Sequence, residues 1–245
     1  MATFVLVHGA WLWASAWNQV ADQLIANGHR VVTPGLTGLG ERSAQLSKSV
    51  DLNTHIADVV TRLDEDELSA VVLVGHGYGG MIISGVAAVR RQRLAQLVFL
   101  DAYVSSNGKS AWDLIPAPLQ QAFLKDARDD GDGWRLPPKE RYYVAWGLPP
   151  GPLRDLVRAH ATDFSLPCLQ APAPLANPLA LPRAFIRGTR KYAAQHLFSS
   201  FAERARSDGW PIYEIDAGHV AYIEKPLALV EILCRIAHLA CGEKT

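Results

Sequence analysis

The chain has 245 residues, of which 49% are hydrophobic, and its 24 Lys and Arg residues balance 24 Asp and Glu residues, so the formal net charge is zero. A chain of this length suits a single α/β domain with a well-buried core. Zero net charge provides no long-range field that would attract phosphate backbones or anionic membrane surfaces, so we expect no nucleic-acid partner and no membrane partner. A neutral small molecule is the better candidate ligand.

The sequence contains no recognisable signal for export, membrane insertion or metal binding. The apolar run at residues 4–7 is too short for a signal peptide, and no window approaches the roughly 18 consecutive apolar residues of a membrane span. The three cysteines, Cys168, Cys234 and Cys241, show neither paired nor metal-ligand spacing. We therefore expect a cytoplasmic protein with no disulfide framework and no metal site.

Short β-rich runs alternate with helical patterns through the first hundred residues. The β-rich runs are residues 4–7, 30–33, 70–74 and 96–100. Helical periodicity covers residues 15–27, 52–68 and 79–91. Continuous apolar strands separated by helices favour a parallel sheet that is covered on both faces. The pattern predicts an α/β fold with a mostly parallel central sheet.

The composition changes in the middle of the chain and then returns to the first pattern. Twelve of the 15 prolines fall within residues 104–182, a stretch that also contains short amphipathic segments and several tryptophans. A solvated linker would expose these large apolar side chains at a cost, so we predict a helical cap at 104–182, inserted into a core formed by 1–103 and 183–245. The expected later elements are strand 183–187, helix 193–207, strand 212–215 and helix 227–239.

A glycine-rich turn follows the third β-rich run, and it permits two interpretations. Residues 75–80 read Gly-His-Gly-Tyr-Gly-Gly and match the dinucleotide-binding pattern G-x-G-x-x-G, with Asp101 about twenty residues further on. In that interpretation the protein is an oxidoreductase that binds NAD(P). However, such a fingerprint normally follows the first strand of its fold, whereas this one follows the third.

The competing interpretation is a nucleophile elbow, G-x-S-x-G, in which residue 77 should be serine but is Gly77. The turn after the first strand suits an oxyanion-hole loop, in which the backbone N–H of Ala10 joins that of Tyr78. Near the C-terminus, His219 follows the last predicted strand, at the position of a general base. Binding of a dinucleotide requires neither the oxyanion loop nor this histidine, so both features favour the nucleophile elbow.

Four segments together resemble the α/β-hydrolase superfamily. They are residues 4–11, 33–43, 75–80 and 218–219. More closely, they are similar to bacterial esterases related to the plant methylesterases of the salicylic-acid-binding type and to hydroxynitrile lyases. The resemblance implies an α/β-hydrolase fold and a Ser-His-Asp carboxylic-ester hydrolase that acts through an acyl-enzyme without a cofactor.

Gly77 departs from this pattern, because glycine has no side chain with which to form an acyl-enzyme. Ser84, Ser105 and Ser106 carry hydroxyl groups, but none of them lies at the elbow. Either the chain is a natural homologue that lost the nucleophile, or it is a Ser→Gly variant made to hold an uncleaved substrate. The second explanation is favoured because the other parts of the machinery are present. We expect the chain to bind substrate rather than to turn it over.

The acid that would support His219 also departs from the family pattern. In the plant relatives it follows the strand after the cap, where this chain has Arg-Gly-Thr-Arg-Lys at residues 187–191. Asp101, at the end of the preceding strand, is the best substitute, and its role would be to fix the tautomer of His219. Asp216 is the alternative, but it lies only three residues before the histidine and more readily supports the local turn.

Aromatic residues near the motif loops are candidates for the substrate pocket, which we expect to accept an ester or a lactone between cap and sheet. These candidates are Trp11, Trp13, Tyr103 and Trp112. A homodimer is compatible with these features. Two functional alternatives on the same fold remain: a natural non-hydrolytic binder or cyclase, and a hydroxynitrile-lyase-like protein, for which Lys191 is the candidate cation.

Overall fold

The structure is a computed structural model that describes residues 1–105, 108–174 and 181–240. Within these ranges the main sheet has six strands in the order β2-β1-β3-β4-β7-β8, and every neighbouring pair is parallel. The strands are β1 (Thr3–Val7), β2 (Arg30–Val32), β3 (Val71–His76), β4 (Leu94–Leu100), β7 (Arg183–Gly188) and β8 (Ile212–Ile215). The expected α/β fold with a parallel central sheet is confirmed.

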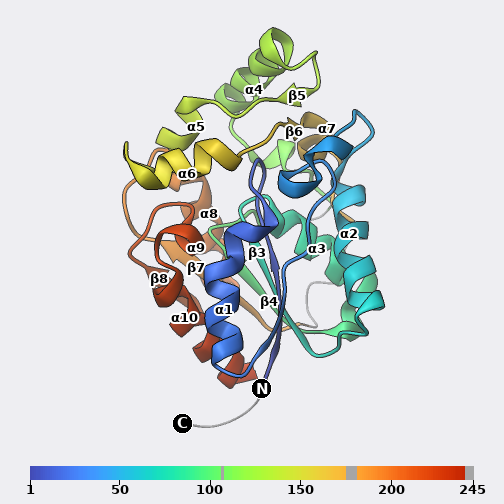
Figure 1. Cartoon of the computed structure of the whole chain (residues 1–245), viewed down its shortest axis with the longest axis vertical. Helices are drawn as coiled ribbons and strands as arrows, with labels where there is room; N and C mark the ends of the chain where they lie inside the picture. Colours follow the sequence, from blue (N-terminus) through green and yellow to red (C-terminus); the bar gives the residue numbers. More distant parts are fainter. Residues whose placement is uncertain (106–107, 175–180, 241–245) are drawn as a thin grey trace.

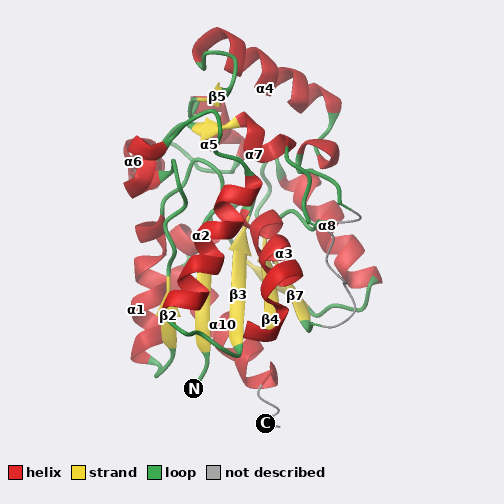
Figure 2. Cartoon of the chain, turned by 90° about the vertical axis from the view of Figure 1, so that its right-hand side faces the viewer, coloured by secondary structure: helices red, strands yellow, loops and turns green. Residues whose placement is uncertain are grey.

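Helices cover both faces of this sheet, as Figures 1 and 2 show. Helices α1 (Asn18–Ala26) and α10 (Pro226–Ala240) pack together on one face, and α2 (Leu52–Glu65) and α3 (Gly79–Arg90) lie on the other. Helix α8 (Gln195–Ser207) packs against β7. Short helices join these elements: η1 (Ala14–Trp17), η2 (Gly40–Gln45), η3 (Arg91–Arg93) and α9 (Ala221–Glu224).

The apolar residues of the central strands explain this arrangement. All six residues of β3 are buried, as a strand in the middle of a doubly covered parallel sheet requires. In α2 the buried apolar residues recur at helical spacing, at Leu52, Ile56, Val59 and Leu63. Asp51 begins this helix with a capping box, because its side chain accepts from the Thr54 backbone N–H at 3.0 Å. Helix and sheet thus meet through faces that the sequence makes apolar.

The elements between β4 and β7 form a layer over the carboxyl ends of the strands, and we refer to them as the cap (Figure 2). The cap contains η4 (Trp112–Leu114), α4 (Ala117–Asp130), β5 (Arg135–Leu136), α5 (Glu140–Ala145), α6 (Pro152–His160), β6 (Phe164–Ser165) and α7 (Leu166–Gln170). Strands β5 and β6 pair in antiparallel fashion. The bounds 104–182 for an inserted unit stay a prediction.

Some elements differ at their ends from the sequence pattern. Strand β3 continues to His76, because the glycine of the motif at residue 75 still pairs with Phe99 of β4. The predicted helix 15–27 begins with a separate 3₁₀ turn, η1, before α1 starts at Asn18. Among the described residues, no helix is both long enough and apolar enough to cross a lipid bilayer.

Candidate active site

Three turns at the carboxyl ends of β3, β4 and β8 bring Gly77, Asp101 and His219 together. Gly77 directly follows β3, Asp101 follows β4, and His219 follows β8 after a short turn. Carboxyl ends of parallel strands meet at one edge of a sheet, where ligand sites of open α/β folds form. Residues more than a hundred positions apart therefore become neighbours.

The turn at Gly77 joins β3 to helix α3 through a sharp bend. Gly77 has φ of 55°, in the left-handed region that favours glycine. A Cβ on this residue would lie 3.3 Å from Nε2 of His219. A Cβ on Gly75 would lie only 2.6 Å from the carbonyl oxygen of Gly79, so these two glycines allow the strand and helix α3 to meet at a sharp turn. The side chain of any other residue at position 77 would point towards His219.

His219 and Asp101 form a buried, hydrogen-bonded pair. Nδ1 of His219 donates a hydrogen bond to Oδ2 of Asp101 at 2.6 Å, and the two residues are 5% and 1% exposed. This bond places the proton on Nδ1 and leaves Nε2 free on the side of Gly77. The backbone N–H of His219 donates to the carbonyl of Trp146 in the cap at 3.0 Å. The histidine is therefore held from both the sheet and the cap.

The backbone of Asp101 is itself unusual. Its φ is 43°, a left-handed value that is uncommon for a residue with a side chain. The backbone N–H of Asp101 donates to the carbonyl of Ile186 in β7 at 2.8 Å, which extends the pairing of the two strands by one step. The left-handed backbone therefore occurs at the residue whose carboxylate accepts the hydrogen bond from His219.

Tyr192 is a third member of this cluster that sequence reasoning did not find. Its hydroxyl donates a hydrogen bond to Oδ2 of Asp101, the atom that also accepts from His219. Burial is the main cause that raises the pKa of Tyr192, and the Asp101 charge adds to it, so the phenol keeps its proton. Tyr192 lies in the loop after β7, where the plant pattern would place the acid. A tyrosine in a loop without periodicity carries no sequence signal for such a role.

Two further residues support the histidine. The ring of Phe198 on α8 stacks on the ring of His219, with centroids 4.5 Å apart and an angle of 18° between the planes. Glu224 of α9 accepts a hydrogen bond from the backbone N–H of Gly218 at 2.9 Å and pairs with Arg190. The turn that carries the histidine is thus tied to α9 and to the loop after β7.

His76, inside the elbow, lies beneath the site. Its Nε2 donates to the backbone carbonyl of His219 at 3.0 Å, and its Nδ1 has no hydrogen-bond partner among the described residues. Burial, followed by the proximity of His219, holds the pKa of His76 well below its usual value. His76 is therefore a neutral packing residue that positions the histidine turn.

The predicted oxyanion loop lies beside Gly77. Trp11, which follows Ala10 in this loop, has a left-handed φ of 63°, and its indole N–H donates to the Leu136 carbonyl of the cap at 2.8 Å. The backbone N–H groups of Ala10 and Tyr78 have no acceptor among the described residues. Ala10 and Tyr78 border the pocket that also contains Gly77 and His219.

This pocket lies between the sheet edge and the cap, and it has about 680 Å³ of space between protein atoms, the open mouth included. Its lining is apolar and aromatic: Trp11, Leu12, Leu119, Phe123, Tyr142, Trp146, Leu169, Leu197 and Phe198 surround the polar floor. No Asp, Glu, Lys or Arg is among the described residues that line it. Apolar walls over a few polar groups are typical of small-molecule sites.

The four aromatic residues predicted for the pocket fall into two groups. Trp11 and Tyr103 line it. Trp13 does not, because its ring stacks on His160 of α6, with centroids 4.9 Å apart. Trp112 in η4 is also outside the lining and packs against the hydrophobic core. Proximity to a motif in sequence therefore did not distinguish pocket residues from packing residues.

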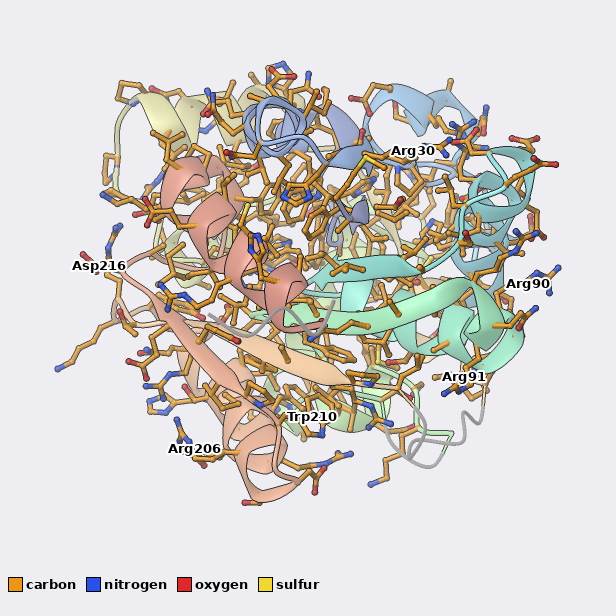
Figure 3. The ribbon with its side chains drawn as sticks, turned by 90° about the horizontal axis from the view of Figure 1, so that it is seen from below. Arg30, Arg90, Arg91, Arg206, Trp210 and Asp216 are labelled. Atoms are coloured by element: carbon orange, nitrogen blue, oxygen red, sulfur yellow. The ribbon has the colours of Figure 1, made fainter. Side chains whose placement is uncertain are left out.

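Other candidates lie away from the pocket. Asp216 is exposed, and Figure 3 shows it at the outline of the molecule beyond the end of β8. Lys191 is exposed and does not line the pocket. The hydroxyl of Ser84 donates to the Gly80 carbonyl at 2.7 Å within helix α3. Ser105 is not a lining residue, and Ser106 lies outside the described residues.

Fold and site together define an α/β protein with a sharp glycine turn and a buried His-Asp pair at the carboxyl edge of its sheet. The sequence model of the alpha/beta hydrolase family matches residues 4–232, so the chain belongs to that family. The resemblance noted in the sequence is confirmed.

Individual relatives include esterases. The chain is 33% identical to the carbendazim hydrolyzing esterase of Nocardioides sp. (strain SG-4G), over 96% of this chain and 100% of that protein. It is 25% identical to a putative chloroplastic methylesterase 11 of Arabidopsis thaliana, over 97% of this chain and 64% of that protein.

Solved structures share the fold. An extracellular alpha/beta-hydrolase from a Paenibacillus species, described as sharing structural and functional homology with tobacco Salicylic Acid Binding Protein 2, superposes with a TM-score of 0.80. Its sequence identity is 22%, and the superposition covers 96% of this chain and 98% of that chain. The expected α/β-hydrolase fold is confirmed.

Proposed function

We propose that this chain carries the site of a carboxylic-ester or lactone hydrolase from which the nucleophile is missing. In this proposal His219 is the general base, Asp101 orients it, and the backbone N–H groups of Ala10 and Tyr78 stabilise the oxyanion. The observation that carries it is the direction of residue 77, because a Cβ there would lie 3.3 Å from Nε2 of His219. A serine hydroxyl on that carbon would be within hydrogen-bonding reach of the base.

The lining of the pocket supports an uncharged substrate. The described lining residues include no Asp, Glu, Lys or Arg, so a carboxylate or a pyrophosphate would lose its hydration without gaining a counter-charge from a lysine or an arginine. The same observation disfavours a dinucleotide. It also disfavours a hydroxynitrile lyase that depends on Lys191, which does not line the pocket. An ester with aromatic or alkyl groups matches the walls.

The intact His-Asp pair favours an enzyme over a pure binding protein. A buried aspartate is costly to maintain without a partner, and here it is held by His219 and Tyr192 in an arrangement that a binder does not require. We infer that residue 77 is the part of the machinery whose side chain is missing, whereas Asp101 supplies the acid from a different strand end than in the plant relatives. The chain as it stands is then impaired by Gly77, because no acyl-enzyme can form there.

Restoring the nucleophile tests this proposal. Hydrolysis of p-nitrophenyl acetate and butyrate is measured for the chain and for Gly77→Ser, and carbendazim serves as a third substrate. We expect Gly77→Ser to raise kcat/KM by roughly a thousandfold or more, since removing a triad member costs up to about a million-fold in such enzymes. Mass spectrometry of the stopped reaction should show the acyl group on residue 77.

The matched control is Gly77→Ser combined with His219→Ala, which keeps the hydroxyl and removes the base. This double variant should lose nearly all of the gain. Equal rates for the chain and Gly77→Ser, with both proteins folded, would contradict the esterase proposal. Saturable binding of NADH, followed by fluorescence, would support the dinucleotide interpretation instead.

A further inference from the structure

Because Gly77 has no side chain, there is open space next to Nε2 of His219. The three heavy atoms nearest to a Cβ at residue 77 are Nε2 and Cε1 of His219, at 3.3 and 3.4 Å, and Cα of Gly9, at 3.9 Å. A Cβ there would therefore make a tight contact with the imidazole of His219 and would occupy space that glycine leaves open. Gly77 and His219 both line the pocket, so in this chain the same space is continuous with the substrate site.

We propose that His219 in this chain acts as a general base for water, which attacks an uncharged ester directly without a covalent intermediate. This inference rests on the proposed function, because it uses the same pocket, base and oxyanion donors. It differs in the nucleophile, which is a water molecule at the place where the serine hydroxyl would lie. Activated esters with good leaving groups, such as aryl esters, are the expected substrate class.

The hydrogen bond between His219 and Asp101 suits this role. Nδ1 donates to Oδ2 of Asp101 at 2.6 Å, so the neutral imidazole carries its lone pair on Nε2, towards Gly77. A water there can donate to Nε2 and present its oxygen to a carbonyl in the pocket. The carbonyl oxygen can in turn accept from the uncommitted backbone N–H groups of Ala10 and Tyr78.

The reaction balances without a further reactant. The water oxygen forms a bond to the carbonyl carbon while Nε2 of His219 takes one of its protons, and the carbonyl π electrons move to the oxygen held by Ala10 and Tyr78. When the tetrahedral intermediate collapses, the bond to the leaving oxygen breaks and the imidazolium returns its proton to that oxygen. One water and one ester give one acid and one alcohol, and His219 ends as it began.

The composition of the pocket excludes the usual covalent route. No Ser, Thr, Cys or Lys is among the described residues that line it. Ser84 does not line it, and its hydroxyl is bonded to the Gly80 carbonyl. Among the described lining residues, His219 is thus the group that can activate a nucleophile, and the space beside Gly77 is where that nucleophile would lie. General-base catalysis of this kind contributes roughly a hundredfold to ten-thousandfold.

Gly77→Ala separates this proposal from simple loss of the nucleophile. Alanine adds no hydroxyl, but its Cβ takes part of the space that water needs near Nε2. If the chain has only lost its serine, glycine and alanine at position 77 should hydrolyse p-nitrophenyl acetate equally slowly. If water attacks directly, we expect the chain to exceed Gly77→Ala by about tenfold or more, within the contribution of a general base.

Alanine at residue 77 would be strained by the left-handed backbone there, so a second variant that leaves Gly77 unchanged is needed. His219→Asn leaves Gly77 in place and removes the base, and it should lower the rate to that of Gly77→Ala. The chain should show no burst of p-nitrophenol and no acylated peptide, and its rate should fall in D₂O. Circular dichroism and thermal unfolding establish that all variants are folded.

The outcomes distinguish the two proposals. If Gly77→Ser is active while the chain, Gly77→Ala and His219→Asn are equally slow, direct water attack is wrong and the esterase proposal stands. A burst or an acylated peptide from the chain itself would also overturn direct attack. If no variant, including Gly77→Ser, hydrolyses any ester, both proposals fail.

Discussion

Tyr192 and His219 share one acceptor, because both donate hydrogen bonds to Oδ2 of Asp101, while Oδ1 of that carboxylate has no partner among the described residues. The Tyr192 hydroxyl stabilises the negative charge of the Asp101 carboxylate, and it thereby weakens the hydrogen bond that the same oxygen accepts from His219. The tyrosine therefore sets how strongly Asp101 can stabilise an imidazolium at His219. We assign Tyr192 as a positioning residue for the pair.

Removing the tyrosine hydroxyl should change the pH dependence of hydrolysis. In the Gly77→Ser background, Tyr192→Phe strengthens the interaction of Asp101 with protonated His219, so the acidic limb of the kcat/KM profile should move to higher pH by up to about one unit. A purely structural role would lower the rate at every pH without moving the limb. The profile measured between pH 5 and 9 decides between the two.

The identity of the acid can be tested with two aspartates. Asp101→Asn in the Gly77→Ser background should lower kcat about ten-thousand-fold, because an amide favours the wrong tautomer of His219. Asp216→Asn, at the exposed position after β8, should stay within about twofold of its parent, as surface substitutions usually do. Equal losses for both variants would show that Asp101 is not the acid.

The cap should determine affinity through the residues that face the pocket. Leu119 on α4 lines the pocket, whereas Leu124 on the same helix is 38% exposed and does not. In the Gly77→Ser background, Leu119→Ala removes apolar contact of roughly 1 kcal/mol, so the KM of p-nitrophenyl butyrate should rise about fivefold. Leu124→Ala is the matched control and should leave KM unchanged. Identical KM values for both variants would mean that α4 does not contact the substrate.

Acid should destabilise the protein through a histidine that does not take part in the chemistry. Burial lowers the pKa of His8 from 6.5 to about 4, and its Nδ1 donates to the Gly9 carbonyl at 3.0 Å. The unfolded chain then binds a proton that the folded chain does not, so stability is lost as the pH falls from 6.5 towards 4. This residue alone accounts for roughly 3 kcal/mol over that window.

His8→Asn keeps a donor for the Gly9 carbonyl and removes the titration. Urea unfolding at several pH values should show a shallower loss of stability below pH 6.5 for this variant than for the parent chain. An unchanged pH slope would show that His8 is not the group responsible.

The sheet could be predicted because its strands are short apolar runs bounded by turn residues. Strand β8, for example, has the bounds that the pattern predicts, 212–215, and α2 and α3 begin at their predicted first residues. The glycine turn and the histidine near the C-terminus could be placed in one site because both follow strands of a parallel sheet. Local pattern was enough wherever the chain alternates strand and helix.

The pocket and the support of the site could not be predicted in the same way. Tyr192 reaches Asp101 from a loop without periodicity, and its role depends on the distance between chain segments 91 residues apart. Trp13 and Trp11 differ by two positions, yet one stacks on His160 and the other lines the pocket. Which side chains of a loop point into the pocket depends on the backbone angles and on packing against the cap. Neither can be predicted from the residue types.

The left-handed backbone at Trp11 and Asp101 has a consequence for engineering. Among the described residues, five non-glycine residues have positive φ, and the other three, Glu67, Ala70 and Asp132, lie outside the pocket lining. Glycine at those three positions would relieve strain of roughly 1 kcal/mol each without touching the chemistry. Glycine at Trp11 would remove a wall of the pocket, and glycine at Asp101 would remove the carboxylate that holds His219. A thermostable version of this protein must therefore keep both residues in spite of their left-handed backbone.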